Sequence, residues 1–176
     1  DVSESRGLGD VYKRQTQEPA IRIISKVGKL ANAADRDHCI QYMVAVGLIF
    51  GDLIAEYYED DFHQENQLID KLRDKMIIEE DNQFSMDYLD PEKRSIANAV
   101  QVFFNDGTCS DDIQIEYPIG HKKRREEGIP LLEEKFWNNL NTCFDKDKSK
   151  LIYDLCLDQE KLEKTNVHEF MELFAK

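Results

Sequence analysis

The sequence predicts an α+β fold, in which a small antiparallel sheet packs with helices and further helices follow it. Two alternating runs, Ala97–Phe104 and Ile113–Tyr117, flank an Asn-Asp-Gly-Thr sequence at residues 105–108. Asp-Gly allows the positive φ of a tight turn, so these runs are expected to pair as an antiparallel hairpin. After Pro130 the spacing of apolar residues becomes four, which is typical of helices. The positions that carry this spacing are Leu132, Phe136, Leu140 and Phe144.

Three segments are expected along the chain. Residues 1–15 are polar, contain glycine and show no usable period, so they are interpreted as a tail, disordered or not native to the domain. Residues 16–129 are expected to form the α+β unit, and residues 130–176 a helical segment with helices near 131–144, 149–157 and 167–174. These last helices are amphipathic, so their apolar faces need a larger helical body to pack on.

Within the α+β segment, residues 21–26 are short and β-branched and are expected to form a strand. A nearly apolar helix is expected over 35–50, capped by Asp35 and ended by Gly51. Further helices are expected over 52–58 and 66–76. Residues 83–88 alternate with period two, which predicts a strand.

The charge of the chain weighs against several classes of partner. Lys and Arg number 23 and Asp and Glu 36, for a net charge of -13. Nucleic-acid binding depends on neutralised phosphates and anionic membranes attract basic segments, so neither partner is expected. The apolar runs are too short to cross a bilayer. Cys39, Cys109, Cys143 and Cys156 are far apart in sequence, and their spacing predicts no metal site.

Two groups of side chains could carry chemistry. His38, Gln41 and Tyr42 would lie on the first turns of the helix over 35–50, with His38 and Tyr42 on one face. This group is either a ligand site or simply the packed end of a helix, and Asp35, Arg36 and Asp37 before it are expected to be a cap and solvated charge. His63 shows no partner in the sequence.

The second group is the basic run at residues 121–125, which begins with His121 and Lys122. A local positive patch in an acidic chain could attract small anions. Because Glu126 and Glu127 follow it, a solvated loop is the equally weighted alternative.

Three long phrases of the sequence are similar to one family. DRDHCIQYMVA, DPEKRSIANAVQVFFNDGT and IEYPIGHKKRREEGIPLLEEKF resemble the C-terminal part of 2-methylcitrate dehydratases in the MmgE/PrpD superfamily. The resemblance runs from about Thr16 to the end of the chain. It implies that the chain is an α+β lid followed by C-terminal helices that pack against a large helical domain outside this chain, with the active site in the cleft between the two domains.

The resemblance also implies a reaction: elimination of water from 2-methylcitrate to give 2-methyl-cis-aconitate in propionate breakdown, without an iron–sulfur cluster or other cofactor. Tyr42 matches a lid tyrosine of related enzymes and is expected to act as an acid/base or hydrogen-bonding residue. His38, Gln41, His121 and Lys122 are expected to help bind the tricarboxylate substrate. The expected setting is the cytoplasm or the mitochondrial matrix, and the expected assembly of the full-length protein is a homodimer.

Other functions stay open at this point. The chain could serve another chemistry of the same superfamily, such as cis-aconitate decarboxylation or an epimerisation. It could instead be a non-catalytic lid that binds anions. The chain alone is expected to be inactive, because a lid supplies only one wall of a cleft.

Overall fold

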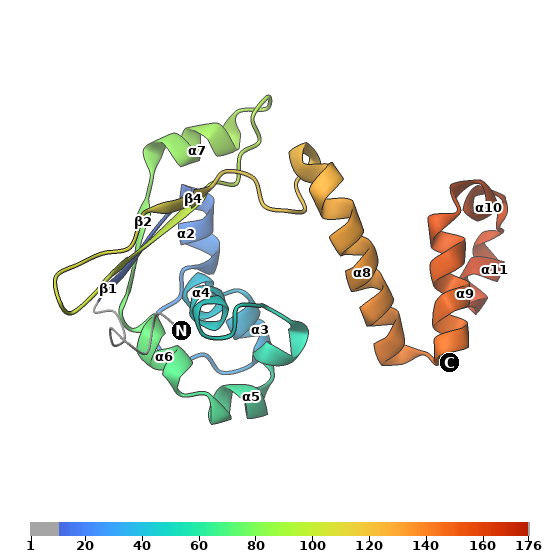
Figure 1. The fold of residues 1–176 in the computed structure, drawn as a ribbon, viewed down its shortest axis with the longest axis horizontal. Helices are drawn as coiled ribbons and strands as arrows, with labels where there is room; N and C mark the ends of the chain where they lie inside the picture. The colour runs from blue at the N-terminus through green and yellow to red at the C-terminus, as the bar shows by residue number, and fades with distance from the viewer. Residues whose placement is uncertain (1–10, 176) are drawn as a thin grey trace. The chain divides into compact units, whose positions relative to one another are not determined.

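The computed structural model describes residues 11–175, and the chain divides into two compact units between Pro118 and Ile119 (Figure 1). Residues 11–118 form an α+β unit and residues 119–175 a helical unit. The expected division near residue 130 falls inside a helix instead, because α8 (Arg125–Cys143) runs through Pro130. Among the described residues, no helix is both long and apolar enough to cross a membrane.

The first unit is built on a four-stranded sheet in the order β2-β1-β3-β4. Its strands are β1 (Val11–Thr16), β2 (Met76–Glu80), β3 (Asn98–Phe103) and β4 (Ile113–Ile115). β1 pairs parallel with β2 and antiparallel with β3, and β3 pairs antiparallel with β4. The sheet is therefore mixed but mostly antiparallel, and the expected α+β class is confirmed.

The expected hairpin is confirmed in its turn and its pairing. The Phe104 N–H donates to the Thr108 carbonyl at 2.9 Å, and Gly107 has φ of 84°, which favours glycine. Residues 11–15, expected to lie in a tail outside the fold, instead form most of the central strand β1. Residues 1–10 lie outside the described part of the chain.

Two expected strands are helices. Residues 21–26 were expected to be extended, yet α2 spans Glu18–Ile24 with Pro19 in its first turn, where a missing N–H and a fixed φ suit a helix. The alternating run at 83–88 lies in α7 (Asn82–Leu89). Asp81 caps α7 by accepting hydrogen bonds from Gln83 N and Phe84 N, and this cap overrides the period-two pattern.

The helix expected over 35–50 is two helices, α3 (Ala33–Asp37) and α4 (Ile40–Phe50). The chain breaks between them because Cys39 adopts an extended conformation. Asn32, rather than Asp35, caps α3, whereas Gly51 ends α4 as expected, with φ of 73°.

The segment after α4 contains short helices: η1 (Ala55–Tyr58), α5 (Asp60–Glu65) and α6 (Leu68–Arg73). α6 confirms the helix expected over 66–76, although it is shorter. The main core of the unit joins α4 and α6 to one face of the sheet. Its buried members are Tyr12, Leu30, Cys39, Tyr42, Ala45, Val46, Ile69 and Leu72.

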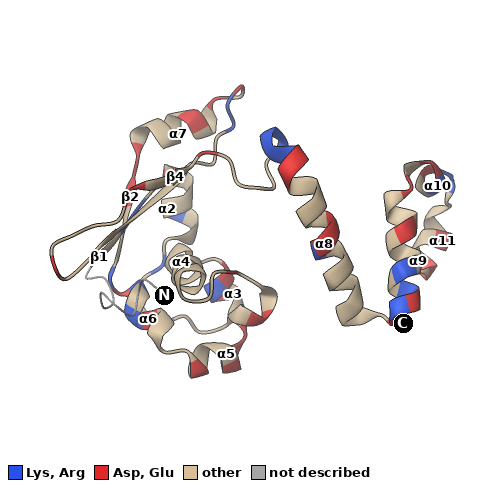
Figure 2. Ribbon diagram, viewed as in Figure 1, with Lys and Arg blue, Asp and Glu red and all other residues tan. Residues whose placement is uncertain are grey.

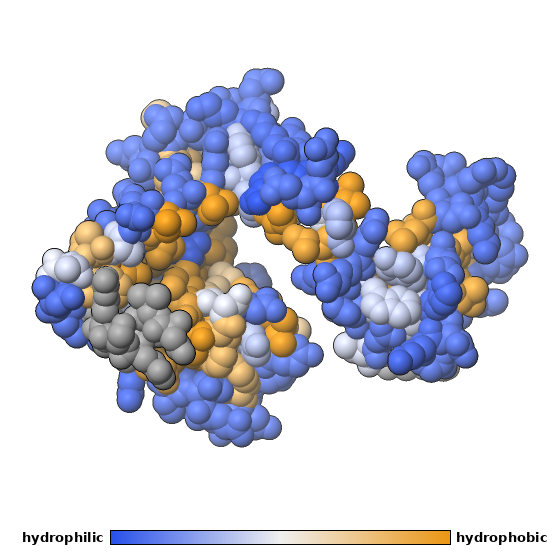
Figure 3. All heavy atoms as spheres, viewed as in Figure 1, coloured by the Kyte–Doolittle hydropathy of each residue, from blue (hydrophilic) through white to orange (hydrophobic). Residues whose placement is uncertain are grey.

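The second unit contains η2 (Lys122–Arg124), α8, α9 (Lys146–Leu157), α10 (Gln159–Lys164) and α11 (Val167–Glu172). The three expected C-terminal helices are present, and α10 is an addition to them. Asp145 and Asp158 cap α9 and α10. The first half of α8 leaves Ile129, Leu131 and Leu132 exposed (orange atoms over α8 in Figure 3), so this unit leaves part of its apolar surface uncovered.

A close backbone approach fixes the start of α8 and can be tested. A Cβ placed on Gly128 would meet the Ile119 carbonyl oxygen at 2.3 Å, whereas a Cβ on helical Gly47 meets nothing within 4 Å. Gly128→Ala is therefore expected to lower the melting temperature of the chain. The matched control Gly47→Ala should be neutral or stabilising by about 0.5–1 kcal/mol, because alanine favours helices. Equal melting temperatures of the two variants would contradict the close contact between Gly128 and the Ile119 carbonyl.

Candidate functional site

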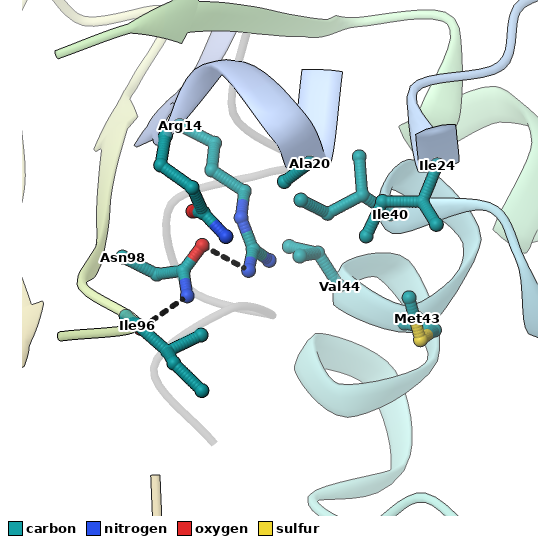
Figure 4. Close-up of a pocket in the computed structure, with 9 residues that line it drawn as sticks. Arg14, Ala20, Ile24, Ile40, Met43, Val44, Ile96 and Asn98 are labelled. Atoms are coloured by element: carbon teal, nitrogen blue, oxygen red, sulfur yellow. Dashed lines mark hydrogen bonds between the residues drawn. The ribbon is translucent and has the colours of Figure 1, made fainter. Parts of the chain in front are cut away.

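A cavity of about 230 Å³ lies in the first unit between α2, α4 and the sheet (Figure 4). Apolar side chains of α2 and α4 form one side of it, and residues from β1 and β3 form the other. Among the residues that line it, Arg14 is the one charged side chain. The lining residues are Arg14, Gln17, Ala20, Ile24, Ile40, Met43, Val44, Ile96 and Asn98.

Polar groups at the sheet side of the cavity are hydrogen-bonded to one another. Arg14 Nη2 donates to Asn98 Oδ1 at 2.9 Å, and Thr16 Oγ1 lies 2.8 Å from that same oxygen. Arg14 Nε is buried and has no hydrogen-bond partner among the described residues. Burial lowers the pKa of Arg14 to about 10, because the charged guanidinium is desolvated.

Among the described residues Arg14 forms no ion pair, and a cation of this kind beside an apolar cavity could bind a small carboxylate. However, Arg14 lies on the central strand β1, on the face that buries Tyr12 and Thr16, and its guanidinium is already hydrogen-bonded to Asn98. A single arginine without a second charged group does not define the chemistry of a ligand, so the cavity carries no functional assignment.

Tyr42, the expected catalytic residue, lies in the core on α4. Its side chain is fully buried and its hydroxyl donates to the Tyr57 carbonyl at 2.7 Å. The rings of Tyr58 and His63 lie against it, with centroids at 6.0 and 5.6 Å. Burial raises the pKa of Tyr42 to about 12, although the nearby charge of Arg36 acts in the opposite direction.

His38 does not share a helix face with Tyr42, contrary to expectation. It ends α3, its side chain is mostly exposed, and Nδ1 pairs with Asp37. Gln41 is on α4 but buried: its amide oxygen accepts from Lys26 N at 3.1 Å and its amide nitrogen donates to Ser25 Oγ at 3.0 Å. Gln41 therefore holds the segment that follows α2.

His121 and Lys122 belong to the second unit, and the Lys and Arg residues that follow His121 form the blue segment before α8 in Figure 2. His121 caps η2, because its Nδ1 accepts from Lys123 N at 3.1 Å. Lys122 is exposed. Arg124 at the end of η2 pairs with Glu127 of α8 at 2.8 Å, so the first turn of α8 partly neutralises the basic run.

The contacts of two residues near Tyr42 were not foreseen from the sequence. Arg36, expected to be solvated, is only 2% exposed; its Nε donates to the Tyr58 carbonyl at 2.6 Å and it forms an ion pair with Asp60. His63, which showed no partner in the sequence, contacts Asp70 at 3.0 Å. The acidic residues around Asp60 indicate that this segment could pair with a cation, but nothing in the sequence identifies Arg36 as that cation. No group of potential metal ligands occurs among the residues that the structure describes.

The model of the MmgE/PrpD C-terminal domain matches residues 13–159 of the chain. This chain belongs to the MmgE/PrpD family. It is 50% identical over 161 residues to a 2-methylcitrate dehydratase of Salmonella typhimurium, and 46% identical over 164 residues to a mitochondrial one of Yarrowia lipolytica. It is also 40% identical over 179 residues to the alkylcitrate dehydratase PhiI of a fungus.

The similarity covers almost all of this chain but a minor part of each relative. It spans 92% of the chain and 33% of the Salmonella protein, 93% and 31% for the Yarrowia protein, and 98% and 34% for the fungal protein. The chain thus spans about a third of the length of these MmgE/PrpD relatives and corresponds to their C-terminal third.

The burial of Arg14 gives the first prediction for this site. Arg14→Met is expected to raise the free energy of unfolding by about 1–3 kcal/mol, because it removes a buried, incompletely bonded charge. Lys13→Met is the control, since it removes the same charge from the opposite face of β1, where Lys13 forms a surface ion pair with Glu79 at 2.9 Å. Urea unfolding that shows Arg14→Met to be less stable than the unchanged chain would refute this.

The burial of Tyr42 gives the second prediction for this site. Its folded-state pKa of about 12 lies above the ordinary 10.0, so the folded chain keeps a proton that the unfolded chain releases. The resulting stabilisation is complete below about pH 10 and is lost as the pH rises toward 12. In an ultraviolet titration of phenolate, Tyr42→Phe should remove one late-titrating phenol. Loss of an early-titrating phenol instead would show that Tyr42 is accessible.

Proposed function

We propose that the whole protein carrying this chain is a hydro-lyase that dehydrates 2-methylcitrate to 2-methyl-cis-aconitate in propionate breakdown. The observation that carries this proposal is the 50% identity to a 2-methylcitrate dehydratase over 92% of the chain. The relative that acts on another alkylcitrate, by its name, supports dehydration of a citrate-like acid more broadly.

The reaction needs a base for a proton beside a carboxylate, an acid for the leaving hydroxyl, and cations for the carboxylates. We assign Tyr42 the acid/base or hydrogen-bonding role. His38, Gln41, His121 and Lys122 are proposed to help bind the tricarboxylate. The exposed side chains of His38 and Lys122 can reach a ligand as they are, whereas Gln41 and Tyr42 must first release their present partners.

The remaining two thirds of the protein are proposed to supply the other wall of the cleft. The exposed apolar residues of α8 support this, because a folded helical unit rarely leaves such a row uncovered. On this proposal the chain alone is inactive, requires no cofactor for the reaction, and belongs to a homodimer when full-length. The name of the Yarrowia relative supports a mitochondrial setting in eukaryotes, and the cytoplasm is proposed for bacteria.

A chimera tests the proposal directly. Residues 16–176 replace the matching C-terminal third of the Salmonella enzyme, and the formation of the unsaturated product from 2-methylcitrate is measured. The chimera is expected to turn over, and the 176-residue chain alone is not. Tyr42→Phe in the chimera should lower kcat by about 10²–10⁴-fold, the range for loss of a general acid or base.

The N-terminal two thirds of the Salmonella enzyme, expressed alone, serve as the control for residual activity. A folded chimera that binds 2-methylcitrate but does not dehydrate it would overturn the assigned reaction. Unchanged kcat in the Tyr42→Phe chimera would overturn the role of Tyr42 alone.

A further inference from the structure

Residues 52–66 form a cap over Tyr42. This cap connects α4 to α6 and contains η1 and α5. Polar contacts hold it to the rest of the unit, among them Tyr42 to the Tyr57 carbonyl, Arg36 to Tyr58 and Asp60, and His63 to Asp70. The rings of Tyr57 and Phe62 also pack with Phe50 at the end of α4.

Arg36 lies under this cap in an unusual position for a cation. Its side chain is only 2% exposed, whereas that of its partner Asp60 is 64% exposed. Among the described residues, both groups that accept hydrogen bonds from the Arg36 side chain belong to the cap. In this ion pair the guanidinium of Arg36 is buried, whereas the carboxylate of Asp60 faces water. A dissolved carboxylate can therefore approach the pair from the side of Asp60.

Arg36 and Tyr42 converge on the same stretch of cap backbone. They donate to consecutive carbonyls, Arg36 to that of Tyr58 at 2.6 Å and Tyr42 to that of Tyr57 at 2.7 Å. Removing the cap from these two donors would leave a guanidinium and a phenol side by side. A planar guanidinium binds a carboxylate in two parallel hydrogen bonds, and a phenol can donate a third.

We propose that Arg36 and Tyr42 form a masked carboxylate-binding site, in which Asp60 occupies the place of a ligand carboxylate and ligand binding displaces the cap. This inference rests on the proposed function, because it supplies one of the cations that a tricarboxylate substrate requires. It also explains how Tyr42, buried in this structure, becomes available to a substrate.

The charge of the cap favours a ligand that replaces Asp60 at Arg36 over a ligand that binds while Asp60 stays in place. Six of its residues are Asp or Glu and none is Lys or Arg. A polyanionic ligand that binds Arg36 therefore repels the cap. Because Asp60 is tethered beside Arg36, it competes at a high effective concentration, so binding to the unchanged chain should be weak.

The test compares two isosteric variants of the 176-residue chain. Asp60→Asn removes the competing charge at Arg36. Asp61→Asn changes the net charge equally on the neighbouring exposed residue, which forms no ion pair among the described contacts. Citrate is titrated by calorimetry at fixed ionic strength. Asp60→Asn is expected to bind citrate at least tenfold more tightly than Asp61→Asn, and the added change Arg36→Met should abolish the gain.

Opening of the cap is measured separately by nitration of tyrosines with mass-spectrometric localisation. Citrate should increase nitration of Tyr42 in Asp60→Asn while Tyr12, buried in the same core, stays protected. Equal citrate affinity of Asp60→Asn and Asp61→Asn overturns the inference, as does equal exposure of Tyr12 and Tyr42, which would indicate general unfolding. The proposed reaction fails independently, if the chimera binds 2-methylcitrate but does not dehydrate it.

Discussion

The first unit depends on the burial of α4. Its sequence, IQYMVAVGLIF, is apolar nearly all round, and a helix of this kind is stable in water only when most of its surface is covered. The sheet, α6 and the cap cover the face of α4 that carries Tyr42, Ala45 and Val46, around which the core forms. Leu48 and Phe50 at the end of α4 stay partly exposed.

Burying α4 also buries its polar groups, and each must then find a partner. Gln41 does so with the backbone and side chain of residues 25–26, and Tyr42 with the backbone of the cap. The polar side chains of α4 thus hold, by hydrogen bonds, neighbouring segments that have little regular structure of their own. The same contacts place a phenol and the Arg36 guanidinium under one cap, which links the stability of the unit to the proposed chemistry.

The second unit follows a different constraint. Asp145 and Asp158 cap α9 and α10, and Phe136 and Trp137 of α8 lie against Tyr153 of α9. Yet three apolar residues in the first half of α8, Ile129, Leu131 and Leu132, remain exposed. Local caps define where α9 and α10 begin, but they do not cover the exposed apolar residues of α8. The covering surface is proposed to come from the remainder of a protein about three times as long as this chain.

The sequence by itself determined the features that depend on neighbouring residues. The Asp-Gly turn, the β3–β4 pair, the end of α4 at Gly51 and the C-terminal helices follow from local periodicity and backbone preference, and the family follows from long specific phrases. Tertiary structure decided the rest. Residues 21–24 and 83–88 are helical, although the first run is β-branched and the second alternates, because α2 packs beside β2 and Phe84 of α7 packs against Ala97 and Ala99. The partners of Arg36 and Tyr42 lie 15–24 residues away in the chain. No local pattern specifies such contacts, because they form only when burial of α4 brings the cap over it.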